Sequence, residues 1–280
     1  MKILYSVDNR FGAAQPLKDF VSVSKHKVRV AAYPSSGRLL QFIDWNLYAA
    51  KQNISTLEQD IKRYYPDLVL IDGEPIVAHI AHKLDIPIIY CSPLHLLDGL
   101  NWTKRDRGYY ATIEKLRFRL SSLPPAINKF IYAPFGGFNL SAKEGFEWIE
   151  PYHIEVESSA NKSVLSSLED PMREKAFQEI YQVSDDLNFI QAHPKDESYS
   201  SSLSAASSII TDGSVRQITD GIYNNKALLV CPKIQDPENV LNAILCQNLQ
   251  LGKNLGQLEL AGRSALEQIE RAVDVIPNRH

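Results

Sequence analysis

Short apolar runs alternate with amphipathic segments along the first third of the chain. Each run is rich in Ile, Val, Leu or Tyr and is short enough to be a buried strand of a parallel sheet. The runs span Lys2–Val7, Lys27–Ala32, Leu68–Ile71 and Ile86–Cys91. Helices are predicted between them, over Gln15–Val23, Ile54–Tyr64 and Ile76–Leu84. This alternation of strand and helix predicts a doubly wound parallel sheet.

The same alternation resumes in the second half of the chain. Strands are predicted over Asn188–Ala192, Ser207–Thr211 and Ala227–Cys231. Helices are predicted over Asn161–Gln182, Val215–Tyr223, Glu238–Asn248 and Leu258–Val273. We therefore expect a second, smaller doubly wound domain.

Chain length and breaker residues predict how the chain divides. The 280 residues suit two domains of ordinary size. Proline and glycine pairs place the boundary between Pro134 and Pro151. The predicted parts are residues 1–140, residues 141–257 and a final helix within residues 258–280.

Composition and charge exclude few classes of protein. Apolar residues make up 44% of the chain, charged residues 22%, and the net charge is −3, so no global feature requires nucleic acid or an anionic membrane. Cys91, Cys231 and Cys246 form no Cys-x-x-Cys pair, which argues against zinc and favours a reducing compartment. The apolar start is too short for a signal peptide, and no apolar stretch approaches the roughly 20 residues that span a bilayer. The expected location is the cytoplasm.

Two loops after predicted strands have the composition of a phosphate and sugar site. The first consists of Asp212, Gly213 and Ser214. Its small residues let backbone N–H groups approach a phosphate at a helix N-terminus. The second, Pro232–Asn239 with Asn242 one turn on, offers carboxylate and amide groups to ribose or sugar hydroxyls. Ordinary strand–helix turns capped by Asp or Ser are the alternative interpretation of both loops.

The order and spacing of these residues resemble a known family. The segment SIITDGSVRQITDGIYNNKALLVCPKIQDPENVLNA resembles the donor-domain signature of two-domain GT-B glycosyltransferases, in the branch related to MurG and the UDP-glycosyltransferases. Matching residues are Ile209–Gly213 for ITNG, Asn225–Pro232 for GKPLLVVP, Glu238–Asn239 for EQ and Asn242–Ala243 for NA. Pro66–Pro75 and the following AHIAHKLDIPIIYCSPLH resemble a segment of the same branch's first domain.

The resemblance implies an α/β fold of two Rossmann-like doubly wound domains facing a cleft. It implies that residues 1–140 bind an acceptor, that residues 141–257 bind a nucleotide sugar, most often UDP-linked, and that residues 258–280 pack back toward the first domain. The implied reaction is an inverting glycosyl transfer. The residues assigned to the donor are Arg10, Gly12, His193, Asp212, Gly213, Ser214, Arg216, Asp220, Glu238, Asn239 and Asn242.

The chain departs from the family pattern at three places. The loop Asp8–Gln15 lacks the His that often activates the acceptor. Ser214 stands where the family has a second Gly, and Asp220 stands where a Glu often binds the ribose. The departures are consistent with an inactive, divergent or unusual-acceptor enzyme.

Without that His, carboxylates at strand ends are the candidate general bases. Asp8 follows the first strand, and Asp72 and Glu74 follow the third. Helix capping is the alternative role of Asp72 and Glu74. His95 matches a family His and is a further catalytic candidate, against a purely structural role.

Metal use and the acceptor are less closely defined by the residues. No Asp-x-Asp pair is present, so no obligatory divalent metal is expected. The acceptor is unspecified and includes small molecules, glycans, lipids and nucleic acids. Trp102–Arg119 mixes aromatic groups with six Lys or Arg residues, which suits a DNA-modifying version of the enzyme or a solvated surface helix. A nucleotide-sugar-binding protein without activity and an epimerase of the same architecture are also compatible with the sequence.

Overall fold

The structure is a computed structural model that describes residues 1–8, 27–33, 49–72, 75–100, 120–138, 140–157, 163–168, 188–232 and 236–256. The described residues form two compact units that meet in sequence between Glu150 and Pro151. The first unit continues past residue 140, because a strand near its end pairs with the first sheet. The predicted helices Gln15–Val23 and Leu258–Val273 and the basic segment Trp102–Arg119 lie outside the described residues.

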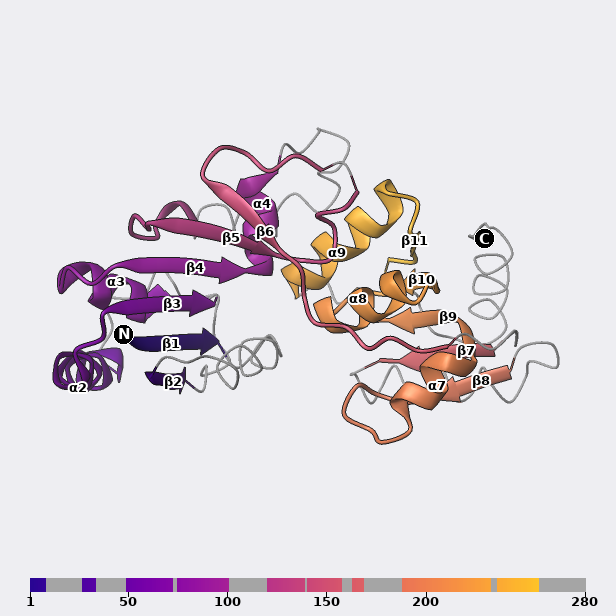
Figure 1. Ribbon diagram of the computed structural model, residues 1–280, viewed down its shortest axis with the longest axis horizontal. Coiled ribbons are helices and arrows are strands. Elements are labelled where there is room, and N and C mark those ends of the chain that lie inside the picture. The colour runs from indigo at the N-terminus through magenta and orange to yellow at the C-terminus, as the bar shows by residue number, and fades with distance from the viewer. Residues whose placement is uncertain are drawn as a thin grey trace. The chain divides into compact units, whose positions relative to one another are not determined.

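The first unit is built on a six-stranded sheet with the order β2-β1-β3-β4-β5-β6, and every neighbouring pair is parallel (Figure 1). Its strands are β1 (Lys2–Asp8), β2 (Lys27–Tyr33), β3 (Leu68–Asp72), β4 (Ile88–Ser92), β5 (Asn128–Tyr132) and β6 (Phe146–Ile149). The first four match the predicted apolar runs. The strands β5 and β6 were not predicted, because their sequences, NKFIY and FEWI, mix polar and apolar residues and form no continuous apolar run.

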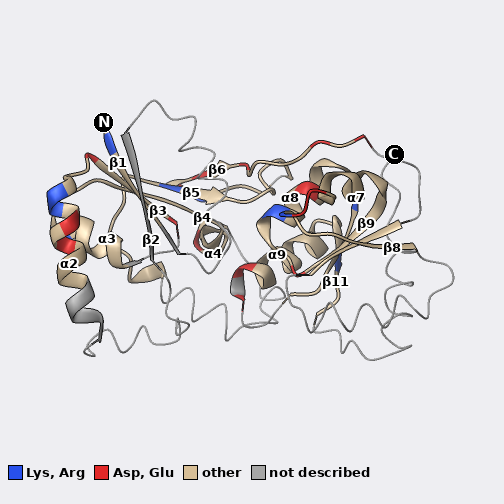
Figure 2. Ribbon diagram, turned by 90° about the horizontal axis from the view of Figure 1, so that it is seen from below, with Lys and Arg blue, Asp and Glu red and all other residues tan. Residues whose placement is uncertain are grey.

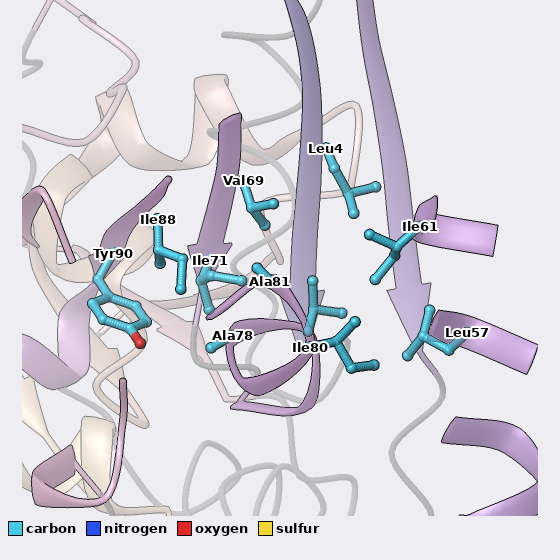
Figure 3. Packing of buried hydrophobic residues seen from close by; sticks show 11 residues of the cluster. Leu4, Leu57, Ile61, Val69, Ile71, Ala78, Ile80, Ala81, Ile88 and Tyr90 are labelled. Atoms are coloured by element: carbon cyan, nitrogen blue, oxygen red, sulfur yellow. The ribbon is translucent and has the colours of Figure 1, made fainter. Parts of the chain in front are cut away.

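Helices α2 (Ala49–Tyr64) and α3 (Pro75–Lys83) pack on the apolar residues of this sheet. Figure 3 shows Leu57 and Ile61 of α2 and Ile80 of α3 in the same cluster of buried side chains as Leu4 and Ile71 of the strands. The helical spacing of these residues creates the apolar stripe that the sheet buries. Each such Leu or Ile contributes about 1.5–3 kcal/mol by leaving water.

The chain turns sharply after β4. A short 3₁₀ helix, η3 (Pro93–His95), leads into α4 (Leu96–Gly99). The Leu94 N–H donates to Ser92 Oγ at 3.3 Å, which caps the turn. Gly99 lies against Ile131 and Phe146 so closely that a β-carbon would collide with them. This packing places α4 against β5 and β6.

The second unit has a five-stranded sheet with the order β11-β10-β9-β7-β8, again parallel throughout. Its strands are β7 (Ser163–Ser167), β8 (Asn188–Gln191), β9 (Ala206–Thr211), β10 (Ala227–Val230) and β11 (Gly252–Asn254). The prediction of helix from Asn161 was wrong over Ser163–Ser167, which forms a buried strand. Its serines are poor strand markers, but neighbouring strands and helices satisfy Ser163 and Ser167 with hydrogen bonds.

Within the described residues, three helices follow strands of this sheet or lead into them. They are α7 (Tyr199–Ala205), α8 (Val215–Tyr223) and α9 (Pro237–Asn248). Helix α8 contacts β9 and β10, and it also contacts α9, so the two helices lie side by side (Figure 1). Helix α8 connects β9 to β10, and α9 connects β10 to β11, so both connections step in the same direction across the sheet. Right-handed crossovers place helices of such successive connections on one face of the sheet. The predicted Val215–Tyr223 helix is confirmed, and α9 begins one residue before its prediction.

Charges of both signs are interspersed on the described surface, as Figure 2 shows for α2 and α8. On α2, Glu58 accepts from Lys62 at 2.7 Å and from Lys83 of α3 at 2.9 Å. Such exposed pairs contribute little stability. Among the helices of the described residues, none has the length and apolar character needed to cross a membrane.

Candidate functional site

Each sheet has one place where the chain connections diverge. In the second sheet, β7 leads to β8 on one side, whereas β9 leads to β10 on the other. In the first sheet, β1 leads to β2 and β3 leads to β4 in the same divergent way. Ligands of doubly wound proteins bind beyond the carboxyl ends of strands at these switch points. The candidate residues are therefore those that follow β7 and β9, and those that follow β1 and β3.

The loop after β9 is held against the first turn of α9. Gly213 has a φ of +95°, a conformation that L side chains rarely adopt. A β-carbon on Gly213 would lie 2.9 Å from the Asn239 carbonyl oxygen and 3.0 Å from Val230 Cγ1. The Asn242 side-chain amide donates to the Gly213 carbonyl at 2.9 Å. The structure thus brings together Gly213, Asn239 and Asn242, which come from two separate loops of the predicted donor site.

The N-terminus of α8 has no side-chain cap within the described part of the chain. Ser214 occupies the N-cap position with an extended backbone, but its hydroxyl accepts no capping hydrogen bond. The Gly213 N–H donates instead to Thr211 Oγ1 at 3.0 Å. The capping alternative therefore does not account for Ser214. The first turn of α8 retains the backbone N–H groups and the positive end of the helix dipole that favour an anion.

Helix α9 begins differently, because Asp236 is its N-cap. The Asn239 N–H donates to Asp236 Oδ1 at 3.4 Å, and Pro237 occupies the first turn. The capping interpretation of Asp236 and Pro237 is thus confirmed. Glu238 and Asn239 are buried, as is Asp212 of the neighbouring loop.

Three residues that sequence analysis did not assign lie at the same switch point. Ser167 ends β7, Thr211 ends β9 and Gln217 lies in the first turn of α8. Gln217 Nε2 donates to the Ser167 carbonyl at 2.7 Å and to Ser167 Oγ at 3.0 Å, and Gln217 Oε1 accepts from the Thr211 hydroxyl. All three are buried. The available signal was Ser-x-x-Gln at a helix start, which ordinarily predicts a reciprocal capping box.

Arg216 and Asp220 form an internal pair rather than an open ligand site. Arg216 Nε donates to Asp220 Oδ2 at 2.8 Å, and its guanidinium lies 5.0 Å from the ring centre of Tyr152. The Ile154 N–H donates to Asp220 Oδ1 at 2.9 Å. Burial raises the pKa of the Asp220 carboxyl, although these donors and the Arg216 charge oppose the shift. Both oxygens of this 0%-exposed side chain are engaged within the protein, so we do not assign it a ribose contact.

The same helix anchors the segment that begins the second unit. Asn224 accepts from the Val156 N–H at 2.8 Å and donates to the Ile154 carbonyl at 2.6 Å. His153 stacks on Tyr223 with ring centres 3.8 Å apart. Asp220 and Asn224 thus give residues 151–157 the hydrogen-bond partners that a neighbouring strand would otherwise provide.

His193 follows β8, the edge strand beyond β7. Its backbone N–H donates to the Asp196 carboxylate at 2.7 Å, which closes a tight turn before α7. This turn lies one strand away from the β7–β9 switch point. His193 therefore stays a predicted donor residue.

In the first unit, β1 and β3 bring two candidate bases to one edge. Val7 is opposite Asp72 in the parallel register, so Asp8 and Asp72 end neighbouring strands at the switch point. Asp72 is 5% exposed, and its charge, after burial itself, contributes to raising the pKa of Tyr5 on the same sheet face. Glu74, Arg10 and Gly12 lie outside the described residues.

His95 is a buried structural residue in this fold. It is 3% exposed and lies between the rings of Tyr90 and Phe146, with ring centres 5.6 and 5.8 Å away. Burial, with a smaller effect of the Lys129 charge, lowers the pKa of His95 to about 3. An enclosed imidazole of such low basicity is unsuited to deprotonating an acceptor. We therefore do not assign His95 a catalytic role.

This buried imidazole predicts a specific loss of stability in acid. The unfolded chain takes up the proton near the ordinary pKa of 6.5, whereas the folded chain resists until about 3. The contribution of the neutral His95 side chain to the free energy of unfolding is therefore fully present above pH 6.5. It is lost as the pH falls from 6.5 toward 3, by up to about 1.4 kcal/mol per pH unit. His95→Phe should flatten this part of the denaturation profile. Equal slopes in the wild type and in His95→Phe would contradict the assignment.

No group of His, Cys, Asp and Glu side chains that could hold a metal ion occurs among the described residues. The side chains that meet at the β7–β9 switch point are amides, hydroxyls and buried carboxylates. The donors directed at a ligand are therefore the backbone N–H groups at the uncapped start of α8, where the positive end of the helix dipole lies. This arrangement is suited to binding an anionic group beside a polyhydroxylated one.

Comparisons with known proteins give a result for the fold alone. No family model matches the sequence. No curated protein matches it either. Among solved structures, MurG of Acinetobacter baumannii superposes with a TM-score of 0.64 at 12% identity, covering 99% of this chain and 91% of that one.

Two further solved structures are similar over nearly the whole chain. The calicheamicin glycosyltransferase CalG4 has a TM-score of 0.62 at 14% identity and covers 97% of this chain and 89% of its own. MnaA of S. aureus, solved with UDP, has a TM-score of 0.59 at 16% identity, with coverages of 98% and 88%. The prediction from the sequence signature is thereby confirmed for the architecture: the chain has the GT-B glycosyltransferase fold, with two doubly wound parallel-sheet domains.

Proposed function

We propose that this chain is a metal-independent, inverting glycosyltransferase that uses a nucleotide sugar, UDP-linked by preference. The observation that carries the proposal is the uncapped first turn of α8 beside the Gly213 loop, at the switch point of the second sheet. Such a helix start binds phosphate through backbone N–H groups and the helix dipole. The S. aureus MnaA structure, which contains UDP, shares this fold.

The donor would lie across the two loops of the second unit. Its diphosphate would accept hydrogen bonds from the start of α8, and its sugar and ribose hydroxyls would meet Glu238 and Asn239 at the start of α9. Domain assignment follows the sequence prediction, with the acceptor on the first unit. Because helix N–H groups supply the positive charge and the sequence lacks Asp-x-Asp, no divalent ion is required for this binding.

The reaction would use a carboxylate at the end of β1 or β3. The acceptor hydroxyl attacks the anomeric carbon as Asp8 or Asp72 takes its proton, and the bond from that carbon to the diphosphate oxygen breaks. The nucleoside diphosphate leaves with both bonding electrons, and the start of α8 stabilises its charge. Attack opposite to the leaving group inverts the configuration. The acceptor itself is left as a hydroxyl compound of undefined class.

Nucleotide binding is the direct test of this proposal. Calorimetry with UDP, GDP, ADP and their sugars should show binding of at least one, with UDP preferred and with no change in EDTA. A ligand at a hundred times its Kd should raise the unfolding free energy by about 2.7 kcal/mol. No heat and no thermal shift from any of them would refute the donor site. Loss of binding in EDTA that Mg²⁺ restores would refute metal independence.

Turnover separates the enzyme from a binding protein of the same fold. A chain that binds UDP-sugar and releases UDP in the presence of a cell extract as acceptor source supports the transferase. Binding without any release, under conditions where the donor saturates the chain, favours a nonenzymatic binding protein. That second candidate has its own support in the missing His of the loop after β1.

A further inference from the structure

The start of α8 contains a capping sequence whose side chains are used elsewhere. Ser214-x-x-Gln217 has the spacing of a capping box, in which Ser and Gln would satisfy each other's backbone N–H groups. Ser214 makes no such bond in the described structure. Gln217 turns inward and uses both ends of its amide to bind Thr211 and Ser167. The helix start is therefore left open by the diversion of Gln217.

Hydrogen bonds from side chains hold both the backbone N–H and the backbone carbonyl of Gly213. On one side, the Gly213 N–H donates to Thr211 Oγ1, and the Thr211 hydroxyl donates onward to Gln217. On the other side, Asn242 Nδ2 donates to the Gly213 carbonyl. Both backbone groups of a residue at φ +95° are thus fixed by buried side chains. Pre-organisation of this kind lowers the entropic cost of binding a ligand at the next N–H groups.

Asn242 has an unsatisfied atom that strengthens this interpretation. Its side chain is 0% exposed, and its Oδ1 has no hydrogen-bond partner among the described residues. A buried amide with an unpaired oxygen is costly, and an apolar side chain of similar size would avoid the cost. The hydrogen bond from Asn242 to the Gly213 carbonyl accounts for an amide at this buried position, and it also fixes the orientation of that amide.

We propose that Thr211, Gln217 and Asn242 are positioning residues of the donor site. They clamp Gly213 so that the open N-terminus of α8 keeps the geometry that a diphosphate needs. This inference rests on the proposed function, because the ligand is the nucleotide proposed there. The three residues act through the Gly213 loop, and the clamp reaches from the end of β7 to α9 across the switch point.

Matched threonine variants test the clamp. Thr211→Val keeps the shape of the side chain but removes both hydrogen bonds of the hydroxyl, so UDP affinity measured by calorimetry should fall about tenfold or more. Thr211→Ser keeps the hydroxyl and should restore near wild-type affinity. Thr219→Val is the control and should leave UDP affinity unchanged. Thr219 is buried, as Thr211 is, but it lies within α8 and donates to the Val215 carbonyl at 2.6 Å rather than to the Gly213 loop. Circular dichroism would establish that each variant is folded at the temperature of measurement.

The hydrogen bond between Asn242 and the Gly213 carbonyl provides a second, independent test of the clamp. Asn242→Asp is nearly isosteric, yet it replaces the donor to the Gly213 carbonyl by an acceptor, so it should also lower UDP affinity about tenfold or more. Equal affinities of wild type, Thr211→Val and Asn242→Asp would overturn the proposal. So would a loss of the same size in Thr219→Val, because the effect would then follow from general destabilisation of α8.

Amide hydrogen exchange distinguishes failure of the clamp from failure of the proposed function. In the unliganded wild type, the Gly213 amide should be protected, and Thr211→Val should accelerate its exchange selectively. If the wild type binds no nucleotide, the proposed function fails and the clamp has no donor to position, even with Gly213 protected. If nucleotide binds but Gly213 exchanges equally fast in both proteins, the proposed function survives and the clamp is refuted.

Discussion

Asp8→Asn is expected to lower the turnover of a sugar-transfer assay by about 10²–10⁴-fold, the usual contribution of a general base. Asp8 ends β1 at the switch point of the first sheet, where no His is available in the following loop. An asparagine amide cannot take the acceptor proton. Nucleotide affinity should stay nearly unchanged, because the proposed donor residues belong to the second unit. Initial rates of UDP release and calorimetry with UDP measure the two effects separately.

Asp72→Asn is the informative comparison. Asp72 ends the neighbouring strand but is 5% exposed and influences the buried Tyr5, so its loss should act mainly on stability. Full activity in Asp8→Asn with loss in Asp72→Asn would transfer the role of base to Asp72. If both variants and Glu74→Gln remain active, a carboxylate base is excluded. His95 would not take its place, because the enclosed imidazole has a pKa of about 3.

Gly213→Val is expected to abolish detectable nucleotide binding. A β-branched residue strongly disfavours a φ of +95°, and its β-carbon would meet the Asn239 carbonyl oxygen at 2.9 Å. The loop must therefore move away from α9, and the start of α8 moves with it. The backbone strain alone costs about 1–3 kcal/mol of stability. Calorimetry with UDP, performed well below the unfolding midpoint, measures the loss of affinity.

Gly145→Val separates strain from displacement. Gly145 has a similar φ of +82°, but nothing lies within 4 Å of the position that its β-carbon would take. This variant should lose stability through strain while it binds UDP normally. Gly213→Val with wild-type affinity would show that the loop does not contribute to the donor site. A similar loss of affinity in Gly145→Val would show that strain anywhere in the chain is sufficient.

Much of the fold was predictable because buried apolar residues recur at a regular, short spacing along each helix and form continuous runs in the buried strands. Ile54, Leu57 and Ile61 recur at helical spacing, and α2 indeed presents this stripe to the core. The buried runs of β1, β3 and β4 are apolar enough to be recognised alone. The strand β7 was missed because its sequence, SVLSS, gains its partners from other elements. Propensity gives way to tertiary context at such positions.

The candidate site was predictable in outline, since strand-end loops with small and polar residues are visible in the sequence. Gly213, Asn239 and Asn242 do meet, as the order of their loops indicated. The roles of other residues depended on partners far along the chain. Asp220 is engaged by Ile154, which lies 66 residues earlier, so a carboxylate in a ribose-binding position became an internal anchor.

Two doubly wound sheets and the loops at their carboxyl edges follow from the amino-acid sequence, because periodic burial and turn chemistry are local properties. Which polar groups remain open to a ligand depends instead on how the folded chain packs. Gln217 has the spacing of a capping residue, yet Ser167, 50 residues away, draws its amide inward. His95 matches a functional position, yet Tyr90 and Phe146 enclose it. A polar side chain binds whichever partner the fold brings nearest, and this competition is settled only when distant segments pack together.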